Sequence, residues 1–102
     1  MRVIKPVRSA EFAGRHRKAS APLARWLTIT RKALWRQFSD VQATFPGADR
    51  ITVASGRTVV CFDIAGNDYR LITAIHYDRR KIFVLRFLTH AEYSKDDWKQ
   101  SL

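Results

Sequence analysis

The spacing of apolar residues along the chain changes at Pro46-Gly47. Before this point apolar residues recur at roughly helical spacing, as Leu23, Trp26, Leu27 and Phe38 do. After it, short runs rich in Val, Ile, Thr and Phe alternate with turns made of Gly, Asn, Asp and Ser, which is typical of strands. The pattern therefore predicts helices in the first part of the chain and a sheet in the second.

The first part is divided by its own capping and breaking residues. A break is expected at residues 18–22, where Ser20 suits an N-cap and Pro22 an early helical position. The predicted elements are a first or edge strand at Arg2–Ile4 and a basic helix from about Pro6 to Lys18. After the break come a helix of about 16 residues that ends at Phe38 and a short helical turn, capped by Ser39-Asp40, that ends at Phe45.

The second part reads as a run of strands followed by one helix. The predicted strands are 50–54, 58–63, 69–77 and 81–88, and a short helix over 89–98 has possible capping boxes at Thr89/Glu92 and Ser94/Asp97. Helices followed by successive strands favour an α+β fold with an antiparallel sheet. We expect one domain over residues 1–102, with N-terminal helices packed on a small twisted antiparallel sheet and a short C-terminal helix.

The register of the last hairpin decides which side chains share a face. If residues 78–80 form a three-residue loop, Tyr77 pairs with Lys81 and Arg86 lies opposite Ile72, diagonal to Arg70. The better core face, predicted to turn towards the helices, then holds Leu71, Thr73, Ile75 and Tyr77 with Lys81, Phe83, Leu85 and Phe87. The other face carries both arginines. A four-residue loop would shift this register and break the geometry.

Charge narrows the range of partners. The chain has 19 Lys and Arg against 9 Asp and Glu, a formal charge of +10 and a pI near 10.7. Nearly all of the excess lies in residues 1–38, which hold ten basic residues and only Glu11 as an acid. Such a field favours polyanions, above all nucleic acid or the ribosome. A soluble basic surface, or one neutralised by an acidic protein, is the alternative.

Other classes of protein are not supported. The sequence has no run of about 18 apolar residues that could span a membrane and no apolar secretory signal, so we expect a cytoplasmic protein. Cys61 has no second cysteine to pair with, and its place in a strand suggests a buried apolar residue. The three histidines show no ligand spacing, so no metal and no cofactor is expected.

Residues at the end of the last strand suggest a metal-free ribonuclease. That chemistry needs a base for the ribose 2′-hydroxyl, positive charge at the phosphate and an acid for the leaving oxygen. His90, Tyr93 and Lys95 are candidates for the proton transfers, and Arg70 and Arg86 for holding the phosphate. Capping or packing is the alternative role for His90 and Tyr93.

The tip of the last hairpin is a candidate RNA contact. Arg79, Arg80 and Lys81 form a basic cluster there, and His76 precedes it on the adjoining strand. A solvated tip without a partner is the alternative.

Two motifs give the chain a family resemblance. The segments Gly66-Asn67-Asp68-Tyr69-Arg70-Leu71 and Thr89-His90-Ala91-Glu92-Tyr93 resemble the hairpin and second signature of the HigB family of type II toxin–antitoxin toxins. Leu23 to Trp26, Trp35 and Phe45 to Ala48 also fit that family, so the resemblance covers nearly the whole chain.

The resemblance implies a RelE-like fold and an mRNA endonuclease that acts on the translating ribosome. It also implies a helix-turn-helix, HigA-like antitoxin, whose complex with the toxin binds operator DNA. A nucleic-acid-binding module without catalysis, or an interaction protein that has lost activity, remains open.

Overall fold

The structure is a computed structural model that describes residues 1–4 and 17–102. Its strands are β1 (Arg2–Ile4), β2 (Asp49–Thr52), β3 (Thr58–Ile64), β4 (Tyr69–His76) and β5 (Lys81–Thr89), and its helices are α2 (Arg17–Lys32), α3 (Phe38–Thr44), α4 (His90–Ser94) and α5 (Asp97–Gln100). The predicted α+β class is confirmed. The first predicted helix lies outside the described residues, apart from Arg17 and Lys18, which belong to α2.

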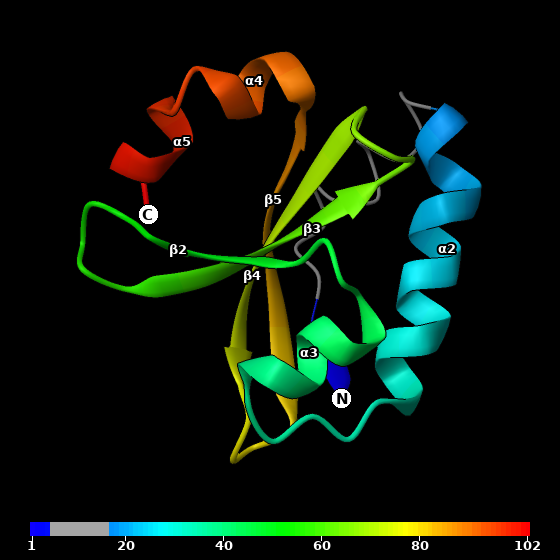
Figure 1. Ribbon diagram of the computed structural model, residues 1–102. Helices are drawn as coiled ribbons and strands as arrows, with labels where there is room; N and C mark the ends of the chain where they lie inside the picture. The colour runs from blue at the N-terminus through cyan, green and yellow to red at the C-terminus, as the bar shows by residue number, and fades with distance from the viewer. Residues whose placement is uncertain (5–16) are drawn as a thin grey trace.

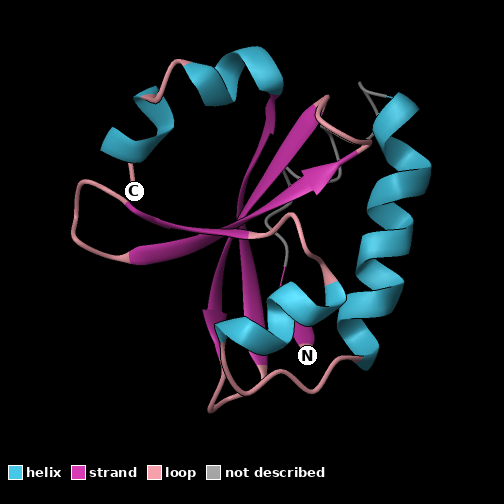
Figure 2. Cartoon of the chain, in the orientation of Figure 1, coloured by secondary structure: helices cyan, strands magenta, loops and turns pink. Residues whose placement is uncertain are grey.

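The five strands form one sheet in the order β1-β5-β4-β3-β2. Pairing from β2 to β5 is antiparallel, as predicted, whereas β1 runs parallel to β5 and makes the sheet mixed. The prediction of an edge strand at Arg2–Ile4 is therefore confirmed. Figures 1 and 2 show a strong twist, with the β2–β3 pair crossing the direction of the β4–β5 pair.

Helices lie on both faces of this sheet (Figure 1). One face packs against α2 and α3 through a cluster that includes Trp26, Val41 and Phe62. The other face packs against the C-terminal segment, where Trp98 of α5 joins Cys61 and Ile72. The expectation that the N-terminal helices cover one face is confirmed.

Aromatic rings hold the N-terminal layer to the sheet. Phe62 of β3 is 1% exposed, and its ring lies 5.4 Å from Trp26, 5.3 Å from Phe45 and 6.2 Å from Trp35, between ring centroids. The contacts with Trp26 and Phe45 are edge-on, the arrangement that aromatic quadrupoles favour. Three separate segments therefore converge on one strand residue.

The predicted break at residues 18–22 is wrong, because α2 runs through it with Pro22 inside the helix. Proline there removes one backbone donor near the described start of the helix. Ala19 and Trp26 lie two turns apart on the same face, and both are buried against the core. Their burial outweighs the local preference of Ser20 and Pro22 for a helix start.

The predicted continuation of this helix to Phe38 is also wrong, because α2 ends at Lys32. Leu34 is 73% exposed, whereas Trp35 is buried and its Nε1 donates to Thr44 Oγ1 at 3.0 Å. Leaving the helix turns Trp35 into the core. The next helix starts at Phe38 after an N-cap at Gln37, and Asp40, expected as a cap, instead accepts from the Arg36 N–H.

The single predicted C-terminal helix is two short helices, α4 and α5. Thr89 and Glu92 form the predicted capping box at the start of α4. The second predicted box is wrong, because Ser94 Oγ donates to the His90 carbonyl and the N-cap of α5 is Asp96. Asp96 has a left-handed φ of 62°, which breaks the helix between the two.

The β4–β5 hairpin has a four-residue loop, so the predicted pairing of Tyr77 with Lys81 is wrong. His76 pairs with Lys81 instead, which shifts the register by one residue at the tip. A bulge at Leu85 then adds one residue to β5, since Thr73 pairs with Val84 and Ile72 with Arg86. Beyond the bulge the predicted register is restored.

This change of register corrects the predicted core face. Ile82 and Val84 face the helices, in the positions predicted for Phe83 and Leu85. Leu85 packs on the other face instead, with Ile72 and Leu88. The β4 part of the prediction is confirmed, because Leu71 and Ile75 do pack on the helical side.

No helix in the described ranges 1–4 and 17–102 is both long and apolar enough to cross a membrane.

We expect Phe62→Ala to lower the free energy of unfolding by about 3–5 kcal/mol, because it removes the ring on which three aromatic side chains converge. Urea denaturation followed by tryptophan fluorescence measures the change. Leu34→Ala, at the exposed position, serves as the control and is expected to change stability by less than about 0.5 kcal/mol. Equal losses in the two variants would contradict this account of the core.

Candidate functional site

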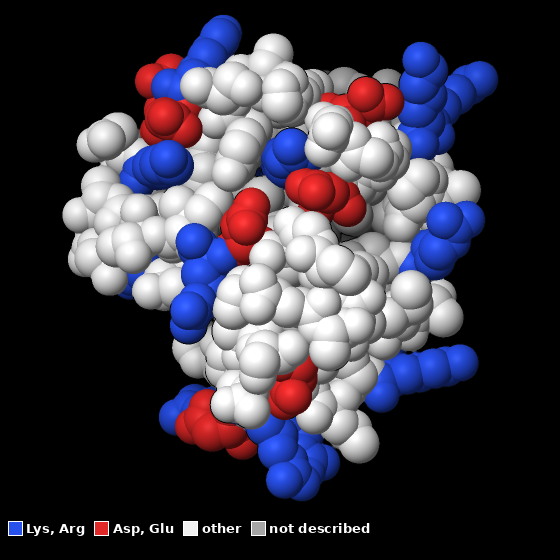
Figure 3. All heavy atoms as spheres, viewed as in Figure 1, with Lys and Arg blue, Asp and Glu red and all other residues white. Residues whose placement is uncertain are grey.

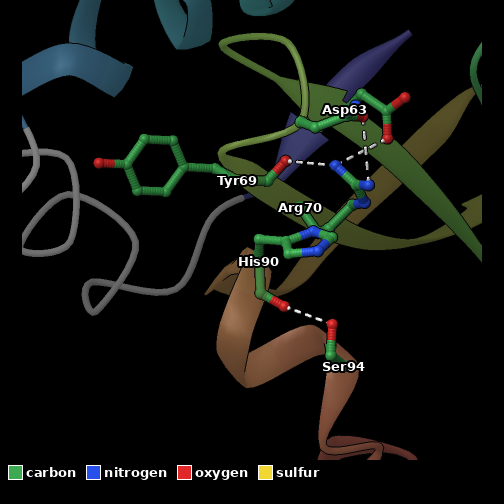
Figure 4. Close-up of polar contacts among 6 residues, drawn as sticks. Asp63, Tyr69, Arg70, His90 and Ser94 are labelled. Carbon is green, nitrogen blue, oxygen red and sulfur yellow. Dashed lines mark hydrogen bonds and ion pairs between the residues drawn. The ribbon is translucent and has the colours of Figure 1, made fainter.

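Arg70 lies at the centre of the site, in β4 opposite Asp63 of β3. Its side chain is 12% exposed, and Nη1 lies 3.1 Å from Asp63 Oδ1. The guanidinium also donates to the Tyr69 carbonyl at 3.3 Å and to Asn67 Oδ1 at 3.4 Å (Figure 4 shows the contacts with Asp63 and Tyr69). These contacts leave part of the five-donor guanidinium open to a further acceptor.

The ring of Tyr93, in α4, packs against the guanidinium of this arginine. The Arg70 guanidinium carbon lies 5.3 Å from the centre of the Tyr93 ring, and that ring stacks on Trp98 at 5.5 Å. Burial, followed by the nearby Cys61 and Asp49, raises the pKa of Tyr93 against the opposing effect of Arg70. The tyrosine hydroxyl is thus turned towards the sheet, and the ring provides a cation–π contact.

His90 begins α4 directly after the end of β5. Its backbone N–H donates to the Asp68 carbonyl at 3.0 Å, and this bond holds the start of α4 against the β3–β4 turn. The residue is exposed, and Figure 4 shows its imidazole on the same side of the strands as Arg70. The structure therefore brings Arg70 and Tyr93 into contact and places His90 directly after the end of β5.

Arg86 and Lys95 are less closely involved. Arg86 lies opposite Ile72, as predicted, but its guanidinium turns to the Leu85 carbonyl at 2.7 Å and to Ser101 Oγ at 3.5 Å. Lys95 is exposed after the last turn of α4 and lines a shallow pocket with Glu92 and Trp98. Among the described residues, neither cation has a hydrogen bond or ion pair to Arg70, His90 or Tyr93.

The predicted RNA contacts lie at the other end of the sheet. Arg79 and Arg80 are exposed in the turn after β4, and His76 pairs with Lys81 where β4 ends and β5 begins. His76 also packs edge-on to Phe83, with ring centroids 5.2 Å apart. The length of β5 separates this tip from His90 by about 26 Å, at a strand rise of roughly 3.3 Å per residue. The two predicted groups are therefore separate surfaces.

The sequence reasoning missed Asp63, Asp49 and Trp98. Asp63 pairs with Arg70, Asp49 lies near Tyr93, and Trp98 supports the tyrosine ring. Asp63 could have been found from the pairing of β3 with β4, because the four-residue turn at residues 65–68 places Asp63 opposite Arg70. The C-terminal stack left no comparable local signal.

Among the described residues, no three His, Cys, Asp or Glu side chains are grouped so as to hold a metal ion. What the strand end offers instead is the Arg70 guanidinium, held in place by Asp63, Tyr69 and Tyr93, and the exposed imidazole of His90. A fixed cation next to a group that can exchange protons suits the binding and cleavage of a phosphodiester.

The architecture is that of a RelE-like protein, with helices packed on a small twisted sheet and a short C-terminal helix after the last strand. A model of the HigB toxin family, the RelE-like toxic component of a toxin-antitoxin system, matches residues 19–96. The chain therefore belongs to this family, and the membership implies an antitoxin as its partner. No curated protein matches the chain significantly.

The stability of the protein at alkaline pH tests whether Cys61 is buried in the cluster that also contains Ile72 and Trp98. Burial is the main cause that raises the pKa of Cys61, from 9.0 to about 12, so the folded state holds the thiol proton more tightly than the unfolded state does. This contribution to stability is complete below about pH 9 and is lost as the pH rises towards 12.

We therefore expect the free energy of unfolding to fall more steeply above about pH 9 in the wild-type protein than in Cys61→Ala, as measured by urea denaturation at a series of pH values. Tyr77 and Tyr93, whose pKa values are also raised, remain in both proteins. Parallel pH profiles would show that the thiol is not desolvated as described.

Proposed function

We propose that this toxin is a metal-independent endoribonuclease that cuts mRNA on the translating ribosome and so arrests translation and growth. The observation that carries the proposal is the contact of Arg70 with Tyr93, with His90 at the same edge of the sheet, where β4 begins and β5 ends. Family membership supports the same reading, because it makes the chain the toxic component of its system.

Each residue has a separate role in the proposed cleavage. His90 exchanges protons with the ribose 2′-hydroxyl or the leaving oxygen, since it is the exposed imidazole at the strand end. The open donors of Arg70 stabilise charge on the phosphate, and Asp63 and Tyr93 fix the position of the guanidinium. Arg86 and Lys95 contribute charge from the border of the site and share the binding of the RNA chain.

The partners in this proposal follow from the activity and from the family. The toxin is cytoplasmic, binds mRNA and the ribosome, and is neutralised by a HigA-like antitoxin with a helix-turn-helix domain. Operator DNA is bound through the antitoxin in the toxin–antitoxin complex. The basic tip formed by Arg79, Arg80 and Lys81 contacts RNA at a distance from the cutting site.

A second candidate is a module that binds RNA without cutting it. The pairing of Arg70 with Asp63 favours this alternative, because the carboxylate neutralises the cation that would hold the phosphate. Mapping of message 5′ ends during growth arrest separates the two functions. New ends within messages support cleavage, and intact ends support binding alone.

We expect His90→Ala to reduce mRNA cleavage by about 10²-fold or more, the usual contribution of a general acid or base. Growth after induction without antitoxin, together with the mapped 5′ ends, measures the effect. Because His90 is exposed, the variant should unfold at the same temperature as the wild type. Gln42→Ala, an exposed polar residue on α3, is the matched control and should stay fully toxic. Full toxicity of a folded His90→Ala protein would exclude the histidine from catalysis.

For the hairpin tip we expect Arg79→Ala combined with Arg80→Gly to weaken binding to ribosomes and to lower the slope of log K against log salt by about 2. Glycine is chosen at position 80 because Arg80 has a φ of 55°. Co-sedimentation with ribosomes at several salt concentrations measures the change. Unchanged binding would mean that the tip is only solvated.

A further inference from the structure

A second cavity lies on the helical face of the sheet, at the end occupied by the β4–β5 hairpin. Its volume is about 390 Å³, within the range of roughly 300–1,000 Å³ that is typical of small-molecule sites. Arg36, Gln37 and Phe38 line it at the start of α3, and Arg50 and Tyr77 line it from the sheet side. None of these residues belongs to the group at the other end of β5.

Two arginines give this cavity its charge. Neither Arg36 nor Arg50 takes part in an ion pair among the described residues. The acidic group nearby is Asp40, whose carboxylate accepts from the Arg36 backbone N–H at 2.9 Å rather than from a guanidinium. Both guanidinium groups are exposed and available to a phosphate, which arginine binds through two parallel hydrogen bonds.

Two aromatic side chains complete the lining. Phe38 is half-buried and carries the Arg50 guanidinium over its ring at 4.7 Å. Tyr77 is also half-buried, and burial raises the pKa of its hydroxyl against the opposing effect of Arg50. Arginine planes and aromatic rings side by side are the surfaces on which RNA-binding proteins stack unpaired bases.

Charge around the cavity favours the same class of ligand. Tyr77 leads directly into the turn that carries Arg79 and Arg80, so the cavity opens beside the basic tip. Figure 3 shows Lys and Arg side chains projecting at this end of the molecule, with acidic side chains between them, and further Lys and Arg side chains along the edge formed by α2. An acidic peptide would satisfy the arginines but would make no use of the stacking surfaces.

We propose that this cavity is a second RNA-binding site, which takes one unpaired nucleotide with its base against Tyr77 and its phosphate on Arg36 and Arg50. The proposal extends the RNA-directed function proposed above and rests on it. Because the cavity and His90 lie at opposite ends of β5, the nucleotide bound here is not the one that is cut. The cavity anchors messenger or ribosomal RNA, while the residues at the end of β5 cut at another nucleotide.

The test uses a short fluorescent 2′-O-methyl oligoribonucleotide, which lacks the 2′-hydroxyl needed for cleavage, so binding is measured apart from cutting. We expect Arg36→Ala and Arg50→Ala each to weaken binding, measured by fluorescence anisotropy, by about fivefold and to lower the salt slope by about 1. Arg31→Ala, at the end of α2, removes the same charge away from the cavity and should change affinity by less than about twofold.

The aromatic part of the site is tested separately. Tyr77→Leu should weaken binding about tenfold through loss of stacking, whereas Tyr77→Phe should retain it. Thermal unfolding of every variant confirms that the fold is kept, which matters because Tyr77 packs against the core.

Two results would overturn the proposal. One is that the Arg36 and Arg50 variants bind no worse than Arg31→Ala. The other is that poly-glutamate displaces the oligonucleotide at equal charge concentration, which would make the occupant an acidic chain. Neither result depends on cleavage, so a toxin that proves unable to cut messages would refute the proposed function and leave this site standing.

Discussion

The pairing of β4 with β5, with its bulge at Leu85, is the constraint on which the rest of the structure depends. A regular strand alternates its side chains between two faces, so Ile82, Val84 and Phe87 could not all point to the same side. The extra residue resets the alternation and lets all three pack under the helices. The same reset leaves Arg86 on the opposite face, with Ile72.

Because of this pairing, the second face of the sheet can support a charged group. Arg70 is held by an ion pair from β3 on one side and by the Tyr93 ring from α4 on the other. A cation that is so nearly buried is costly unless it is paired, and Asp63 provides the pair. The Trp98 ring stacks on the Tyr93 ring and holds it in this position. The position of the guanidinium is therefore set by three elements rather than by its own strand.

The predictions from sequence were most accurate where local chemistry decides the structure. Gly66 marked the β3–β4 turn, in which Ala65 and Gly66 both adopt positive φ, and Thr89 with Glu92 marked the start of α4. They failed at Pro22 and Trp35, where packing against Phe62 overrides the preference of the local sequence. They also failed at the hairpin loop, since three-residue and four-residue loops have similar sequences and differ only in register.

The sequence by itself determined the order of elements, the excess of positive charge, the family motifs, and the placing of His90 and Tyr93 after the last strand. These features depend on residue type and on short-range spacing, both of which can be read along the chain. Only the tertiary structure decided that Asp63 neutralises Arg70, that Arg86 turns away to Ser101, and that Arg36, Arg50 and Tyr77 line one cavity. Those relations join side chains on different strands and helices, and they depend on how these elements pair and pack rather than on residue type alone.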